Sequence, residues 1–249
     1  MSEQANIVIL TGAGKGIGRA TALRLASAGF QVIAVDIDAG SLATLADKCK
    51  DLSGTVVPVK ADVRSRAAVE AAVKEAMDRF GRIDVVINNA GIEIVKPIQD
   101  ITDEDYAATL DINLRSVFLF VRAVVPIMQK QRSGLIVNTS STAGLRGIRD
   151  DAVYCASKFG VIGMSEALDE ELRQYGVRVT YICPGNTNTD LPLSWSPADD
   201  PYRRYFLRPE DIAEAIYYVV SQPQNVAIGQ LVVRPIIQPP YSGMLPLPK

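Results

Sequence analysis

The sequence contains no histidine, only three cysteines and a single tryptophan. Without histidine, the Ser-His-Asp and Cys-His nucleophile systems, the H-E-x-x-H zinc site and the 2-His-1-carboxylate iron site cannot be built within this chain. Cys49, Cys155 and Cys183 are odd in number and far apart, and they form no C-x-x-C pair. We therefore expect neither a disulfide framework nor a metal site.

Long apolar runs and an excess of one charge are missing as well. The formal net charge is -2, from 26 basic and 28 acidic residues, so we expect no general attraction to nucleic acid or to an anionic membrane. No apolar run reaches the roughly 18 residues of a membrane span. The first residues, MSEQANIVIL, lack the basic region of a signal peptide. A cytoplasmic protein is the expectation.

Short apolar runs alternate along the chain with segments of helical periodicity. The runs predict seven strands at 6–10, 30–35, 55–61, 83–88, 134–140, 177–183 and 230–235. The intervening segments predict helices at 17–28, 39–50, 66–80, 104–131 and 153–175. Runs without alternation are typical of strands buried on both faces. The pattern therefore predicts one α/β domain over 1–249, a Rossmann-like, doubly wound, seven-stranded parallel sheet with helices on both faces.

Two segments do not fit this alternation. Residues 186–207 have the length and position of a substrate lid, although an ordinary surface excursion explains them too. Residues 235–249 form a tail with prolines at 239, 240, 246 and 248, which excludes a helix there.

A glycine-rich turn, TGAGKGIG at 11–18, follows the first strand and leads into a helix. Glycines let the backbone approach a phosphate, which the N-H groups of a helix N-terminus favour. The spacing of Gly12, Gly16 and Gly18 is T-G-x-x-x-G-x-G and not the strict G-x-G-x-x-G. A dinucleotide phosphate site is the prediction, with a purely structural turn as the alternative.

Asp36 ends the second strand, where this fold places an acid against the adenosine ribose. A carboxylate there accepts hydrogen bonds from ribose hydroxyls and repels a 2'-phosphate, so NAD is favoured over NADP. Lys15 opposes this choice, since a cation in the loop can approach that phosphate. The alternative role for Asp36 is a helix cap before residue 39.

Tyr154 precedes Lys158 by four residues, so one helix face carries both side chains. Asp151 is placed to cap the start of this helix. To ionise near neutral pH, a tyrosine needs its pKa lowered by about 3 units, or about 4 kcal/mol. A nearby ammonium, a positive nicotinamide ring and partial desolvation supply shifts of this kind. Tyrosine then serves as the general acid or base that histidine provides elsewhere.

Several motifs occur together in a fixed order. They are T-G-x-x-x-G-x-G at 11–18, NNAG at 88–91, Asn113, NTSS at 138–141, Y-x-x-x-K at 154–158 and PG at 184–185. Each is weak alone, but collectively the chain resembles the short-chain dehydrogenase/reductase family over almost its whole length.

The resemblance implies a catalytic set of four residues. Tyr154 would transfer the proton, and Lys158 would lower the tyrosine pKa and hold the nicotinamide ribose. Ser141 would bind the substrate oxygen, with Ser140 as the competing choice. Asn113 would hold a water that links Lys158 to solvent.

The resemblance also implies the cofactor-binding residues, with Asp62 at the adenine and the two threonines at the nicotinamide carboxamide. The expected set is Gly12, Lys15, Gly16, Ile17, Gly18, Asp36, Asp62, Val63, Asn89, Ala90, Gly91, Tyr154, Lys158, Pro184, Gly185, Thr187 and Thr189. For Asn88 and Asn89, tying neighbouring strands together is an alternative or additional role.

Substrate-facing positions in such a fold would supply Glu93, Arg146, Ile148, Arg149, Asn186, Leu191 and Trp195. Arg146 or Arg149 can read a substrate carboxylate, although both also suit a solvated loop.

The predicted function is reversible hydride transfer between NAD(H) and a small secondary alcohol or ketone. One alternative is a 3-oxoacyl-acyl-carrier-protein reductase that uses NADPH, with Arg132 and Arg173 facing the acidic carrier. Another is a dinucleotide-sensing regulator without turnover. The resemblance also implies a homo-oligomer, a tetramer or a dimer, built on the helices at 104–131 and 153–175.

Overall fold

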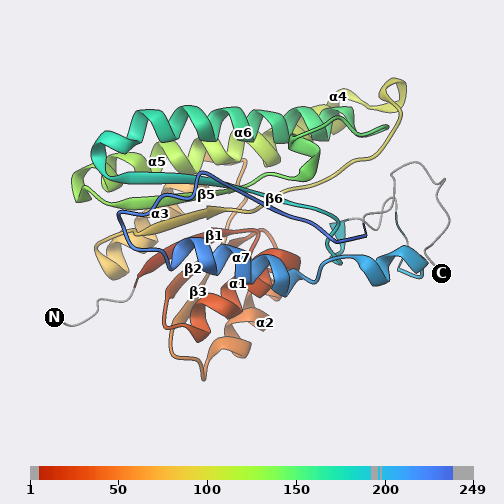
Figure 1. Ribbon diagram of the computed structural model, residues 1–249. Coiled ribbons are helices and arrows are strands. Elements are labelled where there is room, and N and C mark those ends of the chain that lie inside the picture. The colour runs from red at the N-terminus through yellow and green to blue at the C-terminus, as the bar shows by residue number, and fades with distance from the viewer. Residues whose placement is uncertain (1–5, 192–195, 197, 238–249) are drawn as a thin grey trace.

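The computed structural model describes residues 6–191, 196 and 198–237 and has one parallel sheet of seven strands, in the order β3-β2-β1-β4-β5-β6-β7 (Figure 1). The strands are β1 (Ile7–Thr11), β2 (Gln31–Asp36), β3 (Thr55–Lys60), β4 (Val85–Asn88), β5 (Gly134–Thr139), β6 (Val177–Pro184) and β7 (Gln230–Val233). The predicted fold class is confirmed, and each predicted strand is present.

Helices cover both faces of the sheet (Figure 1). One layer consists of α3 (Arg66–Phe80), α5 (Ser116–Gln131) and α6 (Ala152–Leu172), and the opposite layer of α1 (Gly16–Ser27), α2 (Ala39–Cys49) and α7 (Pro209–Val220). The short α4 (Asp103–Leu110) packs on α6. No helix in the described part of the chain is long and apolar enough to cross a membrane.

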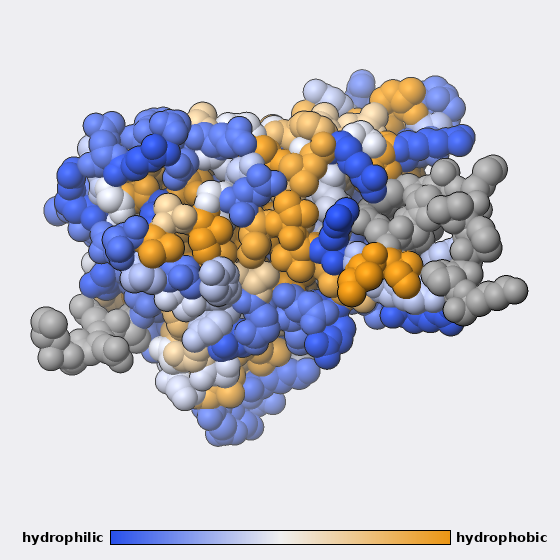
Figure 2. Space-filling model, in the orientation of Figure 1, coloured by the Kyte–Doolittle hydropathy of each residue, from blue (hydrophilic) through white to orange (hydrophobic). Residues whose placement is uncertain are grey.

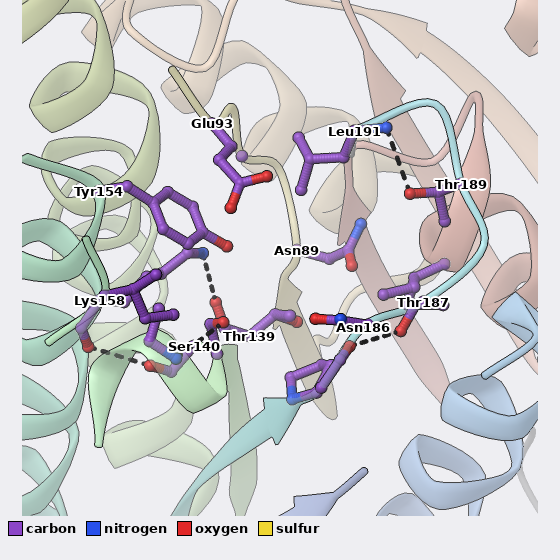
Figure 3. A pocket seen from close by; sticks show the side chains of 17 residues that line it. Asn89, Glu93, Thr139, Ser140, Tyr154, Lys158, Asn186, Thr187, Thr189 and Leu191 are labelled. Carbon is purple, nitrogen blue, oxygen red and sulfur yellow. Dashed lines mark hydrogen bonds between the residues drawn. The ribbon is translucent and has the colours of Figure 1, made fainter. Parts of the chain in front are cut away.

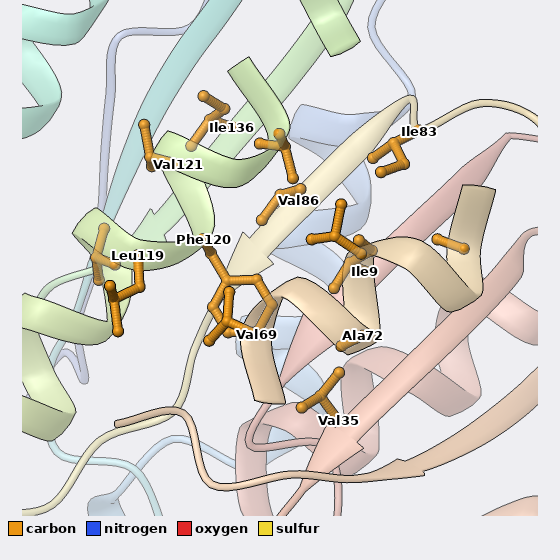
Figure 4. Close-up of a cluster of buried hydrophobic side chains, with 14 of the residues drawn as sticks. Ile9, Val35, Val69, Ala72, Ile83, Val86, Leu119, Phe120, Val121 and Ile136 are labelled. Carbon is orange, nitrogen blue, oxygen red and sulfur yellow. The ribbon is translucent and has the colours of Figure 1, made fainter. Parts of the chain in front are cut away.

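The core explains why the central strands read as uninterrupted apolar runs. Ile9 of β1 and Val86 of β4 are completely buried under α3 and α5, where Phe120 is 1% exposed (Figure 4). Their chain neighbours Val8 and Ile87 are buried just as completely against the opposite layer. A strand covered on both faces has no polar side, so the period-2 pattern of a half-exposed strand is absent.

The helix predicted at 104–131 is not continuous. A π-helical turn, Asp111–Arg115, separates α4 from α5. Such a turn contains an extra residue and often marks a functional site; here it contains Asn113, which is 1% exposed. The spacing of apolar residues cannot reveal this π-helical turn, because the helical pattern continues in α5 after it. The predicted helix at 153–175 likewise ends at Leu172, and a 3-10 turn, Arg173–Tyr175, leads to Gly176 with φ +72.

The strand order fixes where a ligand can bind. From β1 the chain proceeds outward to β2 and β3, and then returns to β4 on the other side of β1. In open parallel sheets, ligands bind beyond the carboxyl ends of the strands where the order reverses. The loops that follow β1 and β4 therefore flank the expected site.

Candidate active site

Two neighbouring pockets lie at this edge of the sheet and share Gly91. The catalytic pocket is lined by fourteen predicted site residues, Ile17, Asn89, Gly91, Glu93, Ser141, Ile148, Tyr154, Lys158, Pro184, Gly185, Asn186, Thr187, Thr189 and Leu191 (Figure 3). The nucleotide pocket is lined by six, Gly12, Asp36, Asp62, Val63, Ala90 and Gly91. Residues predicted from widely separated motifs thus converge on one edge.

Tyr154 and Lys158 lie one turn apart at the start of α6. Both are nearly buried, with 6% of Tyr154 and 4% of Lys158 exposed, and both line the catalytic pocket. The Lys158 Nζ lies 5.6 Å from the centroid of the Tyr154 ring. The amine is therefore close enough to act electrostatically on the phenol.

Lys158 is held by the end of β5. Its Nζ donates a hydrogen bond to the Thr139 carbonyl at 2.9 Å. Burial lowers the pKa of Lys158 to about 8, and the nearby Glu93 carboxylate acts in the opposite direction. Near neutral pH most of the amine is protonated, so the pocket holds an ammonium that water barely reaches.

The two serines at the end of β5 have different partners. The Ser140 hydroxyl donates to the Lys158 carbonyl at 3.0 Å, which fixes strand to helix. The Ser141 Oγ accepts from the Ala143 N-H at 3.1 Å, which leaves the Ser141 O-H proton as a donor into the pocket. Ser141 therefore has the geometry expected of the residue that binds a substrate oxygen.

Asn113 ties the π turn to the loop after β4. Its Oδ1 accepts from the Ile92 N-H at 2.8 Å, and its Nδ2 donates to the Ile92 carbonyl at 2.9 Å and to the Ser157 Oγ at 3.1 Å. A Cβ on Gly91 would lie 3.4 Å from the Asn113 Oδ1 and 3.5 Å from the Lys158 Nζ. A Cβ at Gly91 would thus be in ordinary van der Waals contact with both side chains, so Gly91 lies between Asn113 and Lys158.

The glycine-rich turn leaves the N-terminus of α1 open. Lys15 occupies the N-cap position without a side-chain hydrogen bond to the helix, so its side chain satisfies none of the first N-H groups. Gly16 has φ +50, which favours glycine, and a Cβ on Gly18 would lie 1.9 Å from the Gly12 carbonyl oxygen. The turn fits a bound phosphate group, because uncapped N-H groups and close backbone approach are what a phosphate requires.

Asp36 does not cap α2. Asp38 does so, and its side chain accepts from the N-H groups of Gly40 and Ser41. Asp36 accepts from the Gly14 N-H at 2.9 Å and the Asp38 N-H at 3.0 Å and lines the nucleotide pocket. The structure thus decides against the helix-cap alternative.

The cations near the nucleotide pocket face carboxylates of their own. Lys15 lies 3.8 Å from Asp38, and Arg64 binds Asp62 at 2.7 Å. The Arg64 guanidinium holds the pKa of Asp62 below its usual value. Asp62 is therefore an ionised, paired carboxylate at the pocket that the prediction assigned to adenine.

The paired asparagines after β4 join adjacent strands. The Asn88 Nδ2 donates to the Asn138 Oδ1 of β5 at 2.8 Å, and the Asn89 Nδ2 donates to the Thr11 carbonyl at 3.1 Å. The Oγ1 of Thr11, a residue outside the predicted site, accepts from the N-H groups of Asn89 and Ala90. Both asparagines thus tie neighbouring strands together, and Asn89 also lines the catalytic pocket.

The two ends of the segment 186–207 are hydrogen-bonded to each other. Asn188 donates to the Leu207 carbonyl at 2.7 Å, and Leu207 donates to the Asn186 carbonyl at 2.9 Å. The Thr187 hydroxyl donates to the Gly185 carbonyl, and a Cβ on Gly16 would lie 3.0 Å from the Thr189 Cγ2. The segment therefore connects the catalytic pocket with the phosphate turn.

The substrate-facing predictions divide into two groups. Glu93, Ile148, Asn186 and Leu191 line the catalytic pocket, whereas Arg146 and Arg149 are exposed and are absent from its described lining. Arg149 pairs with Asp150 at 3.4 Å. Trp195 and residues 238–249 of the predicted tail lie outside the described residues.

Asp151 differs from its predicted role. It is the N-cap residue of α6, but its side chain makes no capping hydrogen bond. It forms a side-chain hydrogen bond with Glu93 instead. Burial, and then the Glu93 carboxyl, raise the pKa of Asp151 to about 8. Glu93 and Asp151 are 58 positions apart in the sequence, so no local pattern pointed to the pair.

Comparisons with known proteins agree with this geometry. The family model described as short chain dehydrogenase matches residues 6–199. The 3-oxoacyl-[acyl-carrier-protein] reductase of Thermotoga maritima is 35% identical over 238 residues, with 93% of this chain and 97% of that protein covered.

Two solved structures are similar throughout the chain. A metagenomic short-chain oxidoreductase in complex with NADP is 30% identical with a TM-score of 0.82, covering 95% of this chain and 100% of that one. The 3-ketoacyl-(acyl-carrier-protein) reductase of Brucella melitensis, complexed with NADH, is 30% identical with a TM-score of 0.85, covering 93% and 97%. Since the two carry different cofactors, the choice between NAD and NADP depends on this chain's own residues.

Proposed function

The chain belongs to the short-chain dehydrogenase/reductase family of oxidoreductases, and from that premise we propose that it transfers a hydride reversibly between NAD(H) and a secondary alcohol or ketone. The observation that carries the proposal is the convergence of Ser141, Tyr154 and Lys158 in one pocket, with the Lys158 amine 5.6 Å from the tyrosine ring.

Each of these residues has a definite task. The Ser141 O-H donates to the substrate oxygen, which holds the reacting carbon in place. Tyr154 takes the proton from the alcohol during oxidation and returns it during reduction. The buried Lys158 ammonium stabilises the phenolate form of Tyr154. Asn113 supports Lys158 through the packing at Gly91 and holds the water that carries the proton to solvent. When bound, the nicotinamide accepts or supplies the hydride.

The remaining predicted cofactor residues extend across both pockets. The turn at 12–18 holds the phosphates on the uncapped end of α1, and Asp36 and Asp62 face the adenosine. Asn89, Pro184 and Gly185 line the catalytic pocket, Ala90 lines the nucleotide pocket and Gly91 lines both. Thr187 and Thr189 hold the nicotinamide side from residues 186–207, which act as the lid.

The charges at the nucleotide pocket support NAD. Lys15 is paired with Asp38 and Arg64 with Asp62, so each of the two cations already faces a carboxylate. A 2'-phosphate would then be repelled by the Asp36 carboxylate, and neither Lys15 nor Arg64 would be free to offset that repulsion. Two ribose hydroxyls, in contrast, can donate to Asp36, whose lone pairs are only partly used by N-H donors.

We also propose a homo-oligomer of two or four chains. β7 is an edge strand with Val232 40% exposed, and Ile236 beyond it is fully exposed. Figure 2 shows apolar side chains gathered on the face of the molecule where β7 lies in Figure 1. Phe118 of α5 and Phe159 of α6 are also about half exposed. Apolar surface of this kind is commonly covered in assemblies. Light scattering of the purified protein tests the assembly.

Turnover of a panel of secondary alcohols with NAD and with NADP, followed by the absorbance of the reduced cofactor, tests the function. Formation of NADH that depends on the alcohol supports it. Absence of turnover with every alcohol and ketone would favour a dinucleotide-sensing regulator, which has no need for the convergent serine, tyrosine and lysine.

The likeness to two acyl-carrier-protein reductases supports a second candidate, reduction of a 3-oxoacyl thioester. Of the two arginines predicted to face an acidic carrier, Arg173 is paired with Asp169 and Glu170, and Arg132 lies over the Tyr175 ring. Their engagement favours the small-molecule substrate. A higher kcat/KM for acetoacetyl-carrier protein than for every small ketone would reverse that order.

A further inference from the structure

The catalytic pocket has an acidic side chain in addition to the catalytic lysine. Glu93 and Lys158 are the charged residues among its described lining. The carboxylate of Glu93 acts electrostatically on the Lys158 ammonium. The two opposite charges balance each other, so the interior of the pocket is neutral overall while one wall accepts hydrogen bonds.

Glu93 is held by Asp151, which is 2% exposed. A hydrogen bond between two carboxyl groups requires one proton, since two carboxylates are both acceptors. Burial places this proton on Asp151 near neutral pH, because its pKa is raised to about 8. The other Asp151 oxygen, Oδ1, has no hydrogen-bond partner among the described residues. Asp151 is therefore the donor to Glu93, and the Glu93 oxygens are acceptors.

The position of Glu93 makes these acceptors available to a substrate. Figure 3 shows the Glu93 carboxyl group directed into the pocket that also receives the Tyr154 hydroxyl. The apolar side chains of Ile148 and Leu191 line the same pocket. A carboxylate accepts several hydrogen bonds, and Asp151 uses only part of that capacity.

We propose that Glu93, positioned by Asp151, selects the substrate by accepting a hydrogen bond from a second hydroxyl group next to the reacting carbon. The preferred substrate class is then a neutral vicinal diol, or the corresponding hydroxyketone in the reverse direction. This inference rests on the proposed function. The overall reaction converts the diol and NAD into the hydroxyketone, NADH and one proton, and the second hydroxyl is unchanged.

The charges in the pocket narrow the class to neutral molecules. A substrate carboxylate or phosphate at this position would be repelled by Glu93. A substrate ammonium would stand close to the Lys158 ammonium, which already balances Glu93. A hydroxyl donates to the carboxylate and brings no charge of its own.

The decisive comparison uses butane-2,3-diol stereoisomers, butan-2-ol and 3-hydroxybutyrate with NAD. We expect kcat/KM for the best diol isomer to exceed that for butan-2-ol by at least about 10-fold, as one charge-assisted hydrogen bond provides. The anionic 3-hydroxybutyrate should be the poorest of the three. In Glu93→Leu the diol preference should disappear, and in Glu93→Gln it should decrease, because the amide oxygen is a weaker acceptor.

Glu171→Gln is the matched control. Glu171 is exposed near the C-terminal end of α6, 17 residues beyond Tyr154 and about 25 Å along the helix. The diol preference of the Glu171→Gln variant should equal that of the wild type. A change of preference in this variant would show that the ratio responds to overall charge, which contradicts the proposal.

The shared proton has a readout that does not depend on turnover. The infrared spectrum of the wild type at pH 7 should contain the C=O stretch of a protonated carboxyl group, and Asp151→Asn should lack it. Absence of the band in the wild type contradicts the role of Asp151 as donor.

Failures of the inference and of the proposed function give different results. Equal kcat/KM values for diol and butan-2-ol, unchanged in the Glu93 variants, overturn the inference and leave the function intact. No oxidation of any secondary alcohol and no reduction of any ketone, with NAD or NADP, overturns both.

Discussion

The two pockets at the carboxyl edge of the sheet handle charge in opposite ways. At the nucleotide pocket, Asp62 and Arg64 neutralise each other at a partly exposed surface, and the pKa of Asp62 is lowered. At the catalytic pocket, Lys158 and Asp151 are buried, and their pKa values move to about 8 from opposite directions. Paired surface charges keep their protonation state near physiological pH, whereas buried groups with pKa values near 8 can exchange protons there.

The two pockets also differ in whether backbone or side-chain groups face the ligand. The turn that we propose to bind phosphate has uncapped N-H groups and close backbone approach at Gly16 and Gly18. The catalytic pocket depends on the side chains of Ser141, Tyr154 and Lys158. A change in one pocket should therefore leave the other largely intact, and the following experiments test that separation in order of decreasing effect.

Tyr154→Phe removes only the hydroxyl that we propose to transfer the proton. We expect turnover with a secondary alcohol to decrease at least about 100-fold, as is typical for loss of a general acid or base. NAD binding measured by calorimetry should stay within a few-fold of the wild type, because the phosphate turn and Asp36 are unchanged. Circular dichroism verifies the fold, and near-native turnover in a folded variant would remove Tyr154 from the mechanism.

Gly18→Ala tests the phosphate turn, because its Cβ would lie 1.9 Å from the Gly12 carbonyl oxygen. We expect a decrease of about 1–3 kcal/mol in the free energy of unfolding, together with weaker NAD binding.

The matched control is Gly163→Ala on α6, where a Cβ meets nothing within 4 Å. This variant should gain about 0.5–1 kcal/mol, since alanine is the better helix former. Urea unfolding measures both variants. Equal stabilities of the two would contradict the close approach of Gly18 to Gly12.

Asp36→Ala tests cofactor choice. The wild type should have a higher kcat/KM with NAD than with NADP, and the variant should reduce this preference by about 10-fold, the value of one charge-assisted pair of hydrogen bonds. Asp51→Ala, an exposed change after α2, should leave the preference unaltered. A wild type that prefers NADP would refute the role assigned to Asp36.

The last experiment concerns the pH dependence of stability. The folded Asp151 keeps its proton up to about pH 8, whereas the unfolded residue releases it near its ordinary pKa of 3.8. The folded state thus binds more protons in this window, and stability from this group decreases as pH rises from about 4 to about 8. Lys158 has the opposite effect above pH 8. Its pKa is lowered in the folded state, so the unfolded state binds more protons there and stability rises with pH.

Asp151→Asn should flatten the decrease between pH 5 and pH 8 and raise Tm at pH 8. Thermal unfolding at several pH values measures the slope, with Asp51→Asn as the control of equal charge change. Identical slopes in all three proteins would mean that Asp151 is ionised in the folded state at neutral pH.

Much of the architecture was predictable from the sequence. Apolar runs such as 83–88 predicted buried strands, because a strand covered by helices on both faces has no polar side. The catalytic candidates Ser141, Tyr154 and Lys158 were predictable for another reason: they belong to short motifs that follow strands, and parallel strands bring their carboxyl ends to one edge. Local apolar spacing could not predict the π turn at Asn113, which depends on contacts with Ile92 and Ser157.

The sequence by itself determined the order of strands and helices, the open turn at residues 12–18 and the one-turn spacing of Tyr154 and Lys158, since each depends on residues adjacent in the chain. Only the tertiary structure decided that Asp38 caps α2 and leaves Asp36 facing the nucleotide pocket. It also decided that Asp151 turns from its helix to Glu93. Burial and the pairing of charges from distant segments set protonation, and both exist only once the chain has folded.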